Sequence, residues 1–232
     1  MNVDSHPAYR VELFGDEDEP VVIVDDFSAD PQALIALAAA QEFTSRGQHY
    51  PGVRAQADAS YLGQQADLLQ DILIQVFGMA KGARLAESNY SIVTTAPDQL
   101  TPIQRLPHFD STDPGRLALL HYLSGPEQGG TAWYRHRQTG YERITQDRLA
   151  NYSAVLETEM RAGDLPSSGY VRGDTQHFER TGVVEAKLNR MLIYRGLRLH
   201  SGDIPPDLPR SAMPSTGRLT INTFLQARGQ SL

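Results

Sequence analysis

The 232-residue sequence contains no cysteine. This absence excludes disulfide bonds, cysteine-ligated zinc, iron–sulfur clusters and thiol nucleophiles. The sequence also lacks a run of the roughly 20 apolar residues that a membrane helix needs. Its first 20 residues show neither the basic start nor the apolar stretch that is typical of a secretory signal. We therefore expect a cytoplasmic location.

Positive charge is also scarce. Lys and Arg number 21 against 28 Asp and Glu, which gives a formal net charge of -7, and no Lys/Arg-rich run occurs. A nucleic acid or an anionic membrane would require a basic face, so we expect neither as a partner. With 40% hydrophobic and 21% charged residues, the composition is that of an ordinary globular protein.

The first third of the sequence predicts a strand and two helices. The run PVVIVDDF at residues 20–27 has the composition of a β-strand, and a helix is expected after it, capped by Asp30 with Pro31 in its first turn. Apolar residues at helical spacing predict a second helix over about 60–79. Between the two helices, YPGVRA is typical of a turn or loop.

The sequence from Glu87 onward changes to short β-type runs separated by Pro and Gly, a pattern that favours a sandwich or barrel. The runs are SNYSIVTT, TPIQRLPHF, LALLHYLS, GGTAWYRHR, NRMLIYRG, LRLH and RLTINTFLQ. A helix over 145–163 is expected as an insertion outside the barrel, as part of a lid or a dimer contact, with Leu149, Tyr152, Leu156 and Met160 buried together. We predict one domain over 1–232, with residues 1–86 packed on a β core at 87–232 and the helical insertion at about 144–163.

The stretch LPHFDST places His108 and Asp110 two residues apart, just after Pro107. The proline favours extended backbone before it, and on a strand the two side chains would point to the same side. An isolated pair of this kind is usually a surface feature. However, His200 ends another predicted β run, and two imidazoles with one carboxylate form the triad that binds Fe(II) with open positions.

The strand RLTINTFLQ alternates in polarity. Its more polar face would carry Arg218, Thr220, Asn222 and Phe224. If this face lines the barrel interior, Arg218 is a buried cation that requires an anion, and its guanidinium matches a carboxylate. If Arg218 is instead exposed, Arg195 and Arg198 are the next candidates for binding a carboxylate.

Taken in order, HFD, LHSG and RLT resemble the iron(II)/2-oxoglutarate-dependent oxygenase superfamily, closest to its prolyl-hydroxylase-like branch, over about residues 90–225. The resemblance implies a mainly β fold with flanking helices: a double-stranded β-helix, or cupin-like jelly roll, with N-terminal helices. It further implies that Fe(II) is held by His108, Asp110 and His200. By the same likeness Arg218 and Thr220 would bind 2-oxoglutarate, Tyr122 would be a second contact to it, and Ala132 would face the pocket.

Other histidines compete for the metal. His177 is the main rival of His200, whereas His136 lies among arginines that would repel a cation. His121 would point away from the interior if Tyr122 points inward, and is expected to be structural.

The resemblance implies an oxygenase that couples decarboxylation of 2-oxoglutarate to hydroxylation of a C–H bond with O₂. Two alternatives stay open: a cupin-like binding module without turnover, and a metal-dependent hydrolase or isomerase that does not use 2-oxoglutarate. Arg218 distinguishes the oxygenase from the metal-dependent hydrolase or isomerase. The substrate is expected to be a small molecule or a peptide, and a homodimer is one arrangement that the inserted helix could support.

Overall fold

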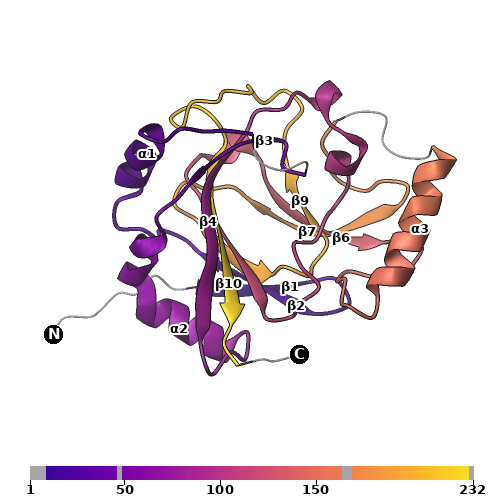
Figure 1. Ribbon diagram of the computed structural model, residues 1–232, viewed down its shortest axis with the longest axis horizontal. Coiled ribbons are helices and arrows are strands. Elements are labelled where there is room, and N and C mark those ends of the chain that lie inside the picture. The colour runs from indigo at the N-terminus through magenta and orange to yellow at the C-terminus, as the bar shows by residue number, and fades with distance from the viewer. Residues whose placement is uncertain (1–8, 46–48, 164–168, 230–232) are drawn as a thin grey trace.

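Two antiparallel β-sheets face each other in the computed structural model (Figure 1), which describes residues 9–45, 49–163 and 169–229. Trp133 of the smaller sheet packs with Ile23 and Leu192 of the larger one, so an apolar cluster joins the two inner faces. The larger sheet has the order β1-β2-β8-β5-β10-β4-β3, and the smaller has the order β7-β6-β9. The strands are β1 (Tyr9–Phe14), β2 (Glu19–Val24), β3 (Gly52–Gln56), β4 (Ala83–Val93), β5 (Arg116–Tyr122), β6 (Gly130–His136), β7 (Phe178–Glu185), β8 (Met191–Arg195), β9 (His200–Asp203) and β10 (Leu219–Ala227).

The N-terminal helices cover the outer face of the larger sheet (Figure 1). Helix α1 (Pro31–Ala39) begins as predicted, because the Asp30 side chain accepts a hydrogen bond from the amide of Ala33 at 2.9 Å. The second predicted helix is shorter than expected: 3₁₀ helix η1 (Ala59–Gln65) precedes helix α2 (Ala66–Gln75). Ile72 of α2 shares the main core cluster with Leu219 and Ile221, so the apolar face of β10 packs on the helices.

Helix α3 (Leu149–Ala162) lies at the opposite side of the molecule, outside the sheets, where an inserted helix was predicted (Figure 1). Its burial differs from the expectation. Tyr152 is buried with Leu149 and Leu156 packed beside it, but Met160 lies outside this cluster. Instead, the charged Glu159 is the second buried residue of the helix.

Three secondary-structure assignments from the sequence were wrong. The YPGVRA segment is not a loop, because β3 pairs with β4 at the edge of the larger sheet. The TPIQRLPHF run is not a strand, because it begins as 3₁₀ helix η3 (Pro102–Arg105), which the proline at its first position favours. The LRLH run is a loop followed by a strand, since β9 begins at His200 and does not end there. Strands β1 and β7 were not predicted.

The turn between β1 and β2 is held from both sides. The Glu142 carboxylate accepts hydrogen bonds from the amides of Asp16 and Glu17, at 2.9 and 3.1 Å. The Arg198 guanidinium donates to the carbonyl oxygens of Phe14 and Glu19. This hairpin is thereby tied to the loop that connects β8 in the larger sheet to β9 in the smaller one.

The remaining short helices are η2 (Pro97–Gln99) and η4 (Pro126–Gln128). Within the part of the chain that the structure describes, none of the helices has the length and apolar character needed to cross a membrane.

Candidate metal centre

The backbones of His108 and His200 form an isolated antiparallel bridge. Each amide donates to the other residue's carbonyl oxygen at 2.8 Å, and the two imidazole rings lie 4.4 Å apart. Two residues further on, the amide of Asp110 donates to the carbonyl oxygen of Gly196 at 2.7 Å. The segment around His108 is therefore extended, in agreement with the effect of Pro107, although it belongs to neither sheet.

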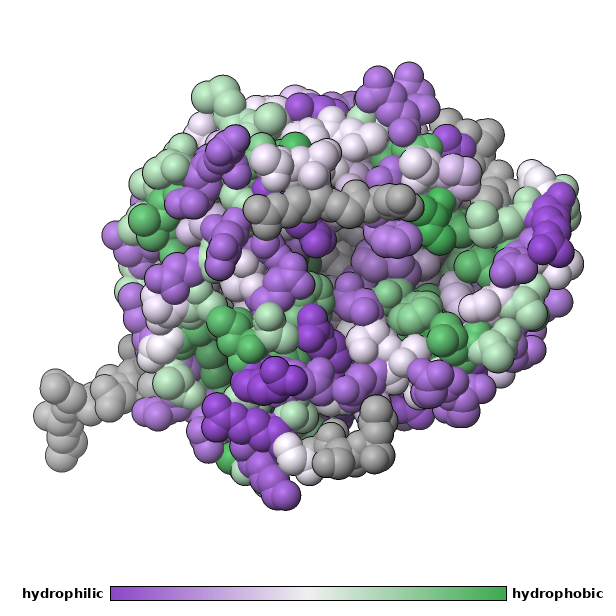
Figure 2. Space-filling view, viewed as in Figure 1, coloured by the Kyte–Doolittle hydropathy of each residue, from purple (hydrophilic) through white to green (hydrophobic). Residues whose placement is uncertain are grey.

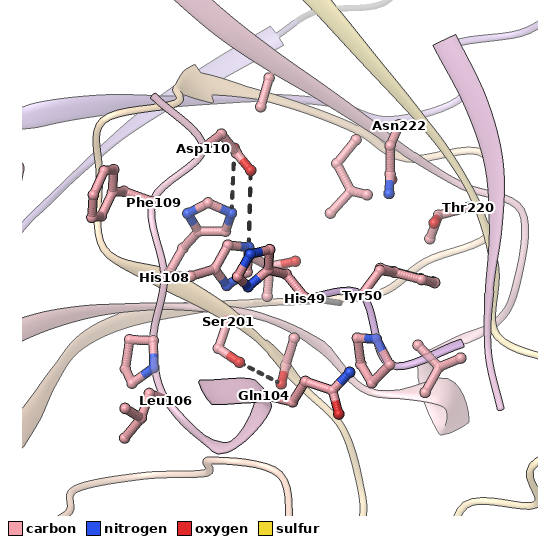
Figure 3. Close-up of a pocket in the computed structure, with 18 of the residues that line it drawn as sticks. His49, Tyr50, Gln104, Leu106, His108, Phe109, Asp110, Ser201, Thr220 and Asn222 are labelled. Atoms are coloured by element: carbon pink, nitrogen blue, oxygen red, sulfur yellow. Dashed lines mark hydrogen bonds and ion pairs between the residues drawn. The ribbon is translucent and has the colours of Figure 1, made fainter. Parts of the chain in front are cut away.

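These main-chain bonds bring two imidazoles and one carboxylate together (Figure 3). The His108 Nε2 lies 3.9 Å from one Asp110 carboxylate oxygen, and the His200 Nε2 lies 3.6 Å from the other. The three potential ligand atoms lie within 4.8 Å of one another. Ligand atoms at about 2.1 Å from a shared ion are roughly 3 Å apart, so small side-chain rotations suffice for all three to bind one cation.

The tautomer of His200 suits a metal ligand. Its Nδ1 lies 2.8 Å from the carbonyl oxygen of Arg198, to which only a protonated nitrogen can donate. The Nε2 lone pair therefore faces Asp110 and the cavity. Hydrogen bonds of this kind commonly fix the ring orientation of metal-binding histidines.

The protein around the site favours neutral imidazoles. Burial lowers the pKa of His108 and of His200 to about 4, and for His108 the proximity of His200 adds to this effect. About half of the His108 side chain is open, but it opens into the cavity beside the triad. Burial also raises the pKa of Asp110, whereas His108 and Arg54 act in the opposite direction. Neutral imidazoles are the form that binds a metal.

A cavity of about 630 Å³ opens beside the three side chains. In the same view as Figure 1, the molecular surface is hollowed near its centre, with hydrophilic and apolar side chains around the opening (Figure 2). Tyr50, Thr220 and Asn222 lie across the cavity from His108 and Asp110 (Figure 3).

Arg218 lines this cavity and is only 5% exposed. Its Nε donates to the carbonyl oxygen of Gln128 at 3.1 Å, and its Nη2 donates to that of Gly130 at 2.8 Å. Arginine has five N–H groups, so these two bonds fix the guanidinium while leaving others free. Thr220 lies in β10, two residues after Arg218 in the chain. It faces the same cavity and is buried.

Two further residues that the resemblance placed at the cavity do not line it. Tyr122 is fully buried beneath Arg218, with the guanidinium carbon 5.6 Å from its ring centre, and its hydroxyl hydrogen-bonds Thr131 at 2.5 Å. It is absent from the described residues that line the cavity. On β6, Thr131 faces the cavity, whereas Ala132 packs in the cluster under α3. Strand alternation puts the two neighbours on opposite sides.

The rival histidines are occupied elsewhere. His136 and His177 both contact the Glu159 carboxylate, at 2.9 and 3.1 Å, beneath α3. His121 is fully buried and hydrogen-bonded to Asn189 at 3.0 Å.

The rival arginines also have other partners. Arg195 contacts Glu19 at 3.3 Å, and Arg198 holds the β1–β2 turn from a position with 1% exposure.

Sequence analysis missed the wall of the cavity formed by His49, Tyr50 and Arg54. The register explains its position: Arg54 of β3 is paired with Ser91 of β4, which is paired with Thr220 of β10. Directly paired residues share a face of a sheet, so Arg54 lies on the inner face with Thr220. Val53, Arg54 and Ala55 alternate between apolar and polar, which is typical of a strand. The preceding Pro51 and Gly52 are typical of a turn, so the segment was predicted as a loop.

Comparison with known proteins defines the fold. HygX from Streptomyces hygroscopicus, solved with nickel and 2-oxoglutarate bound, aligns with a TM-score of 0.51 and 12% identity over 92% of this chain and 85% of that chain. The non-heme alpha ketoglutarate dependent epimerase SnoN from nogalamycin biosynthesis aligns with a TM-score of 0.49 and 11% identity, over 90% and 78% of the two chains. The fold is a double-stranded β-helix, a cupin-like jelly roll with flanking helices, as predicted.

The family is established by sequence. A family model matches residues 5–225, and the chain belongs to that family, DUF6445, which is described as a family of unknown function. None of the curated proteins matches the sequence.

Proposed function

We propose that this protein is an Fe(II)- and 2-oxoglutarate-dependent oxygenase that hydroxylates a small molecule with O₂. The observation that carries the proposal is the convergence of His108, Asp110 and His200 beside a cavity that also contains the buried Arg218. The likeness to HygX, which was solved with nickel and 2-oxoglutarate bound, supports it. Assignment to the prolyl-hydroxylase-like branch is part of the proposal and rests on the HFD, LHSG and RLT motifs.

The proposed roles follow from donor chemistry. Two neutral imidazoles and a carboxylate suit Fe(II), and three ligands leave positions open for 2-oxoglutarate and O₂. Iron and 2-oxoglutarate, when bound there, would supply the oxidising chemistry, with decarboxylation coupled to C–H hydroxylation. His200 is oriented by the Arg198 carbonyl oxygen.

Co-substrate binding is assigned to Arg218 and Thr220. The free N–H groups of Arg218 match the distal carboxylate of 2-oxoglutarate, and Thr220 offers a neighbouring hydroxyl. Tyr122 supports the Arg218 guanidinium from below and is not proposed as a direct contact. A hydrolase or isomerase acting without 2-oxoglutarate does not require a dicarboxylate site, so the buried Arg218 favours the oxygenase.

A small molecule is favoured as substrate over a peptide. The cavity volume of about 630 Å³ lies within the usual range for small-molecule sites. Phe109, Tyr152 and Leu156 give it apolar walls that suit the apolar part of a small molecule. A cytoplasmic location and a homodimer stay predictions from the sequence.

The test is Fe(II)-dependent formation of succinate from 2-oxoglutarate, together with Fe(II) affinity measured without oxygen. Asp110→Ala should abolish both while the thermal melt stays cooperative, because the triad lies beside a cavity and outside the apolar clusters. His177→Gln is the control and should retain both. Retention of Fe(II) binding by Asp110→Ala, or its loss in His177→Gln, would refute the assignment of the metal ligands.

A further inference from the structure

A second guanidinium, that of Arg54, lies on the cavity wall. Its backbone is fixed twice: β3 pairs with β4, and the Arg54 amide and carbonyl exchange hydrogen bonds with Thr44, each at 2.9 Å. The guanidinium carbon lies 4.3 Å from the ring centre of Tyr50, which also lines the cavity. The side chain is therefore held on a rigid platform and faces the interior.

Unlike Arg218, Arg198 and Arg190, the partly buried Arg54 makes no side-chain hydrogen bond or ion pair among the described residues. Its Nε is buried and makes no hydrogen bond. By contrast, Arg218 and Arg198 each donate to two carbonyl oxygens, and Arg190 pairs with Asp25. Because the Nε–H group of Arg54 has lost its hydration and has no acceptor in the protein, the position favours the binding of an anion from the cavity.

The charges already present do not provide that anion. Among the described residues that line the cavity, Asp110 is the one carboxylate. This step rests on the proposed function: the divalent metal and Arg218 together are balanced by Asp110 and the two carboxylates of 2-oxoglutarate. One positive charge, that of Arg54, is left for a third component.

The rest of the wall indicates the nature of that component. Apolar and aromatic side chains line a large part of the cavity, among them Ile103, Leu106, Phe109, Tyr152, Leu156 and Tyr170. A single planar guanidinium binds a carboxylate through two parallel hydrogen bonds. We infer that Arg54 binds the carboxylate of the substrate, and that the substrate is a small carboxylic acid with an apolar body.

The experiment compares straight-chain acids of six, eight and ten carbons with their primary amides, which match them in shape but carry no charge. Binding is measured by calorimetry on wild type, Arg54→Gln and Arg54→Lys, both on protein without metal and on protein loaded with Ni(II) and 2-oxoglutarate. Wild type should prefer an acid over its amide by about 10- to 100-fold, as expected for a charged hydrogen-bonded pair. Arg54→Gln should reduce this ratio to about 1, and Arg54→Lys should retain part of it because the charge remains.

Arg210→Gln is the matched control. Arg210 also stacks on a tyrosine of the cavity wall, Tyr170, at 5.1 Å, but it is absent from the described lining residues and donates to the carbonyl oxygens of Leu208 and Pro205. This variant should keep the acid preference of wild type. Thermal melts of all variants show whether each one is folded.

The outcomes separate the two proposals. Absence of an acid preference in wild type at every chain length, or an unchanged preference in folded Arg54→Gln, would overturn the assignment of Arg54. Loss of metal-dependent 2-oxoglutarate binding in Arg54→Gln, with the acid preference intact, would place Arg54 in the co-substrate site and also overturn it. If wild type failed to bind 2-oxoglutarate with metal, the proposed function would fail, while the acid preference without metal would still decide the role of Arg54.

Discussion

Arg198 contacts His200 through its backbone and the β1–β2 turn through its side chain. Its carbonyl oxygen accepts the His200 Nδ1 hydrogen bond at 2.8 Å, whereas its guanidinium donates to Phe14 and Glu19. The backbone contact orients a proposed metal ligand, and the side-chain contact holds an N-terminal hairpin. Substitution of the Arg198 side chain therefore removes the contact with the hairpin and leaves the contact with His200.

Arg198→Met should therefore lower stability much more than metal affinity. The variant leaves two carbonyl oxygens of the turn without their donor, which costs about 2–4 kcal/mol in the free energy of unfolding. Fe(II) affinity should change less than about tenfold, since the carbonyl oxygen that orients His200 remains. Urea unfolding and anaerobic metal titration measure the two quantities. A large loss of metal affinity in a variant of unchanged stability would contradict this division.

Arg218 is expected to determine 2-oxoglutarate binding. At a hundredfold excess over its dissociation constant, 2-oxoglutarate should stabilise the Mn(II)-loaded wild type by about 2.7 kcal/mol. Arg218→Lys should keep part of this shift because the charge remains, although lysine cannot form the bidentate hydrogen bonds that arginine makes to a carboxylate. Arg218→Met should keep almost none of it.

The Arg218 comparison must use the shift caused by the ligand, not the absolute melting temperature. Arg218 also bonds the carbonyl oxygens of Gln128 and Gly130, so Arg218→Met destabilises the protein even without ligand. Equal ligand shifts in all three proteins would show that Arg218 does not touch 2-oxoglutarate.

Glu142 should contribute to acid unfolding. Burial alone would raise the pKa of Glu142, but the amides of Asp16 and Glu17 and the Arg135 guanidinium outweigh it and lower the pKa below its usual value. A depressed pKa in the folded state means that the contribution to stability is complete above the unfolded pKa, about 4.3, and is lost as pH falls through the folded value. Glu142→Gln should be less stable than wild type at pH 7, and the difference should shrink below about pH 4. Urea unfolding across this range tests the prediction, which a pH-independent difference would contradict.

Glu159 is predicted to fasten α3 to the smaller sheet. It contacts the imidazoles of His136 and His177 in a buried position, so Glu159→Ala should lower the free energy of unfolding by about 3–5 kcal/mol. Glu157→Ala on the same helix is the control. Glu157 pairs with Arg161 at the surface, and its loss should cost at most about 1 kcal/mol. Similar costs for the two variants would show that the buried cluster does not hold the helix.

Local chemistry made part of this site predictable from the sequence. His108 and Asp110 lie two residues apart in the chain, and His200 and Arg218 each lie in a short recognisable motif, so these residues could be proposed from the sequence. Arg54 could not, because its position depends on the register of β3 against β4 and β10, which no local pattern specifies.

The fold was predictable to a similar degree. Alternating runs predicted most of the strands, and capping residues predicted the start of α1. The 3₁₀ turn at Pro102 and the edge strand at Gly52 were misassigned, because Pro and Gly occur both in turns and at the ends of short edge strands. The buried charge of Glu159 was also missed, since its two histidine partners lie far away in the sequence.

The main-chain bonds among His108, Asp110, Gly196 and His200 have a consequence for how this family can diversify. Since backbone groups hold the segments that carry the triad, substitutions in the cavity wall do not remove the bonds that place them. Side chains on η3, α3 and β3 can therefore change in size or charge during evolution while the three segments keep their positions. We expect relatives to differ most at these wall positions, so that the cavity can accept different ligands while the candidate metal site stays in place.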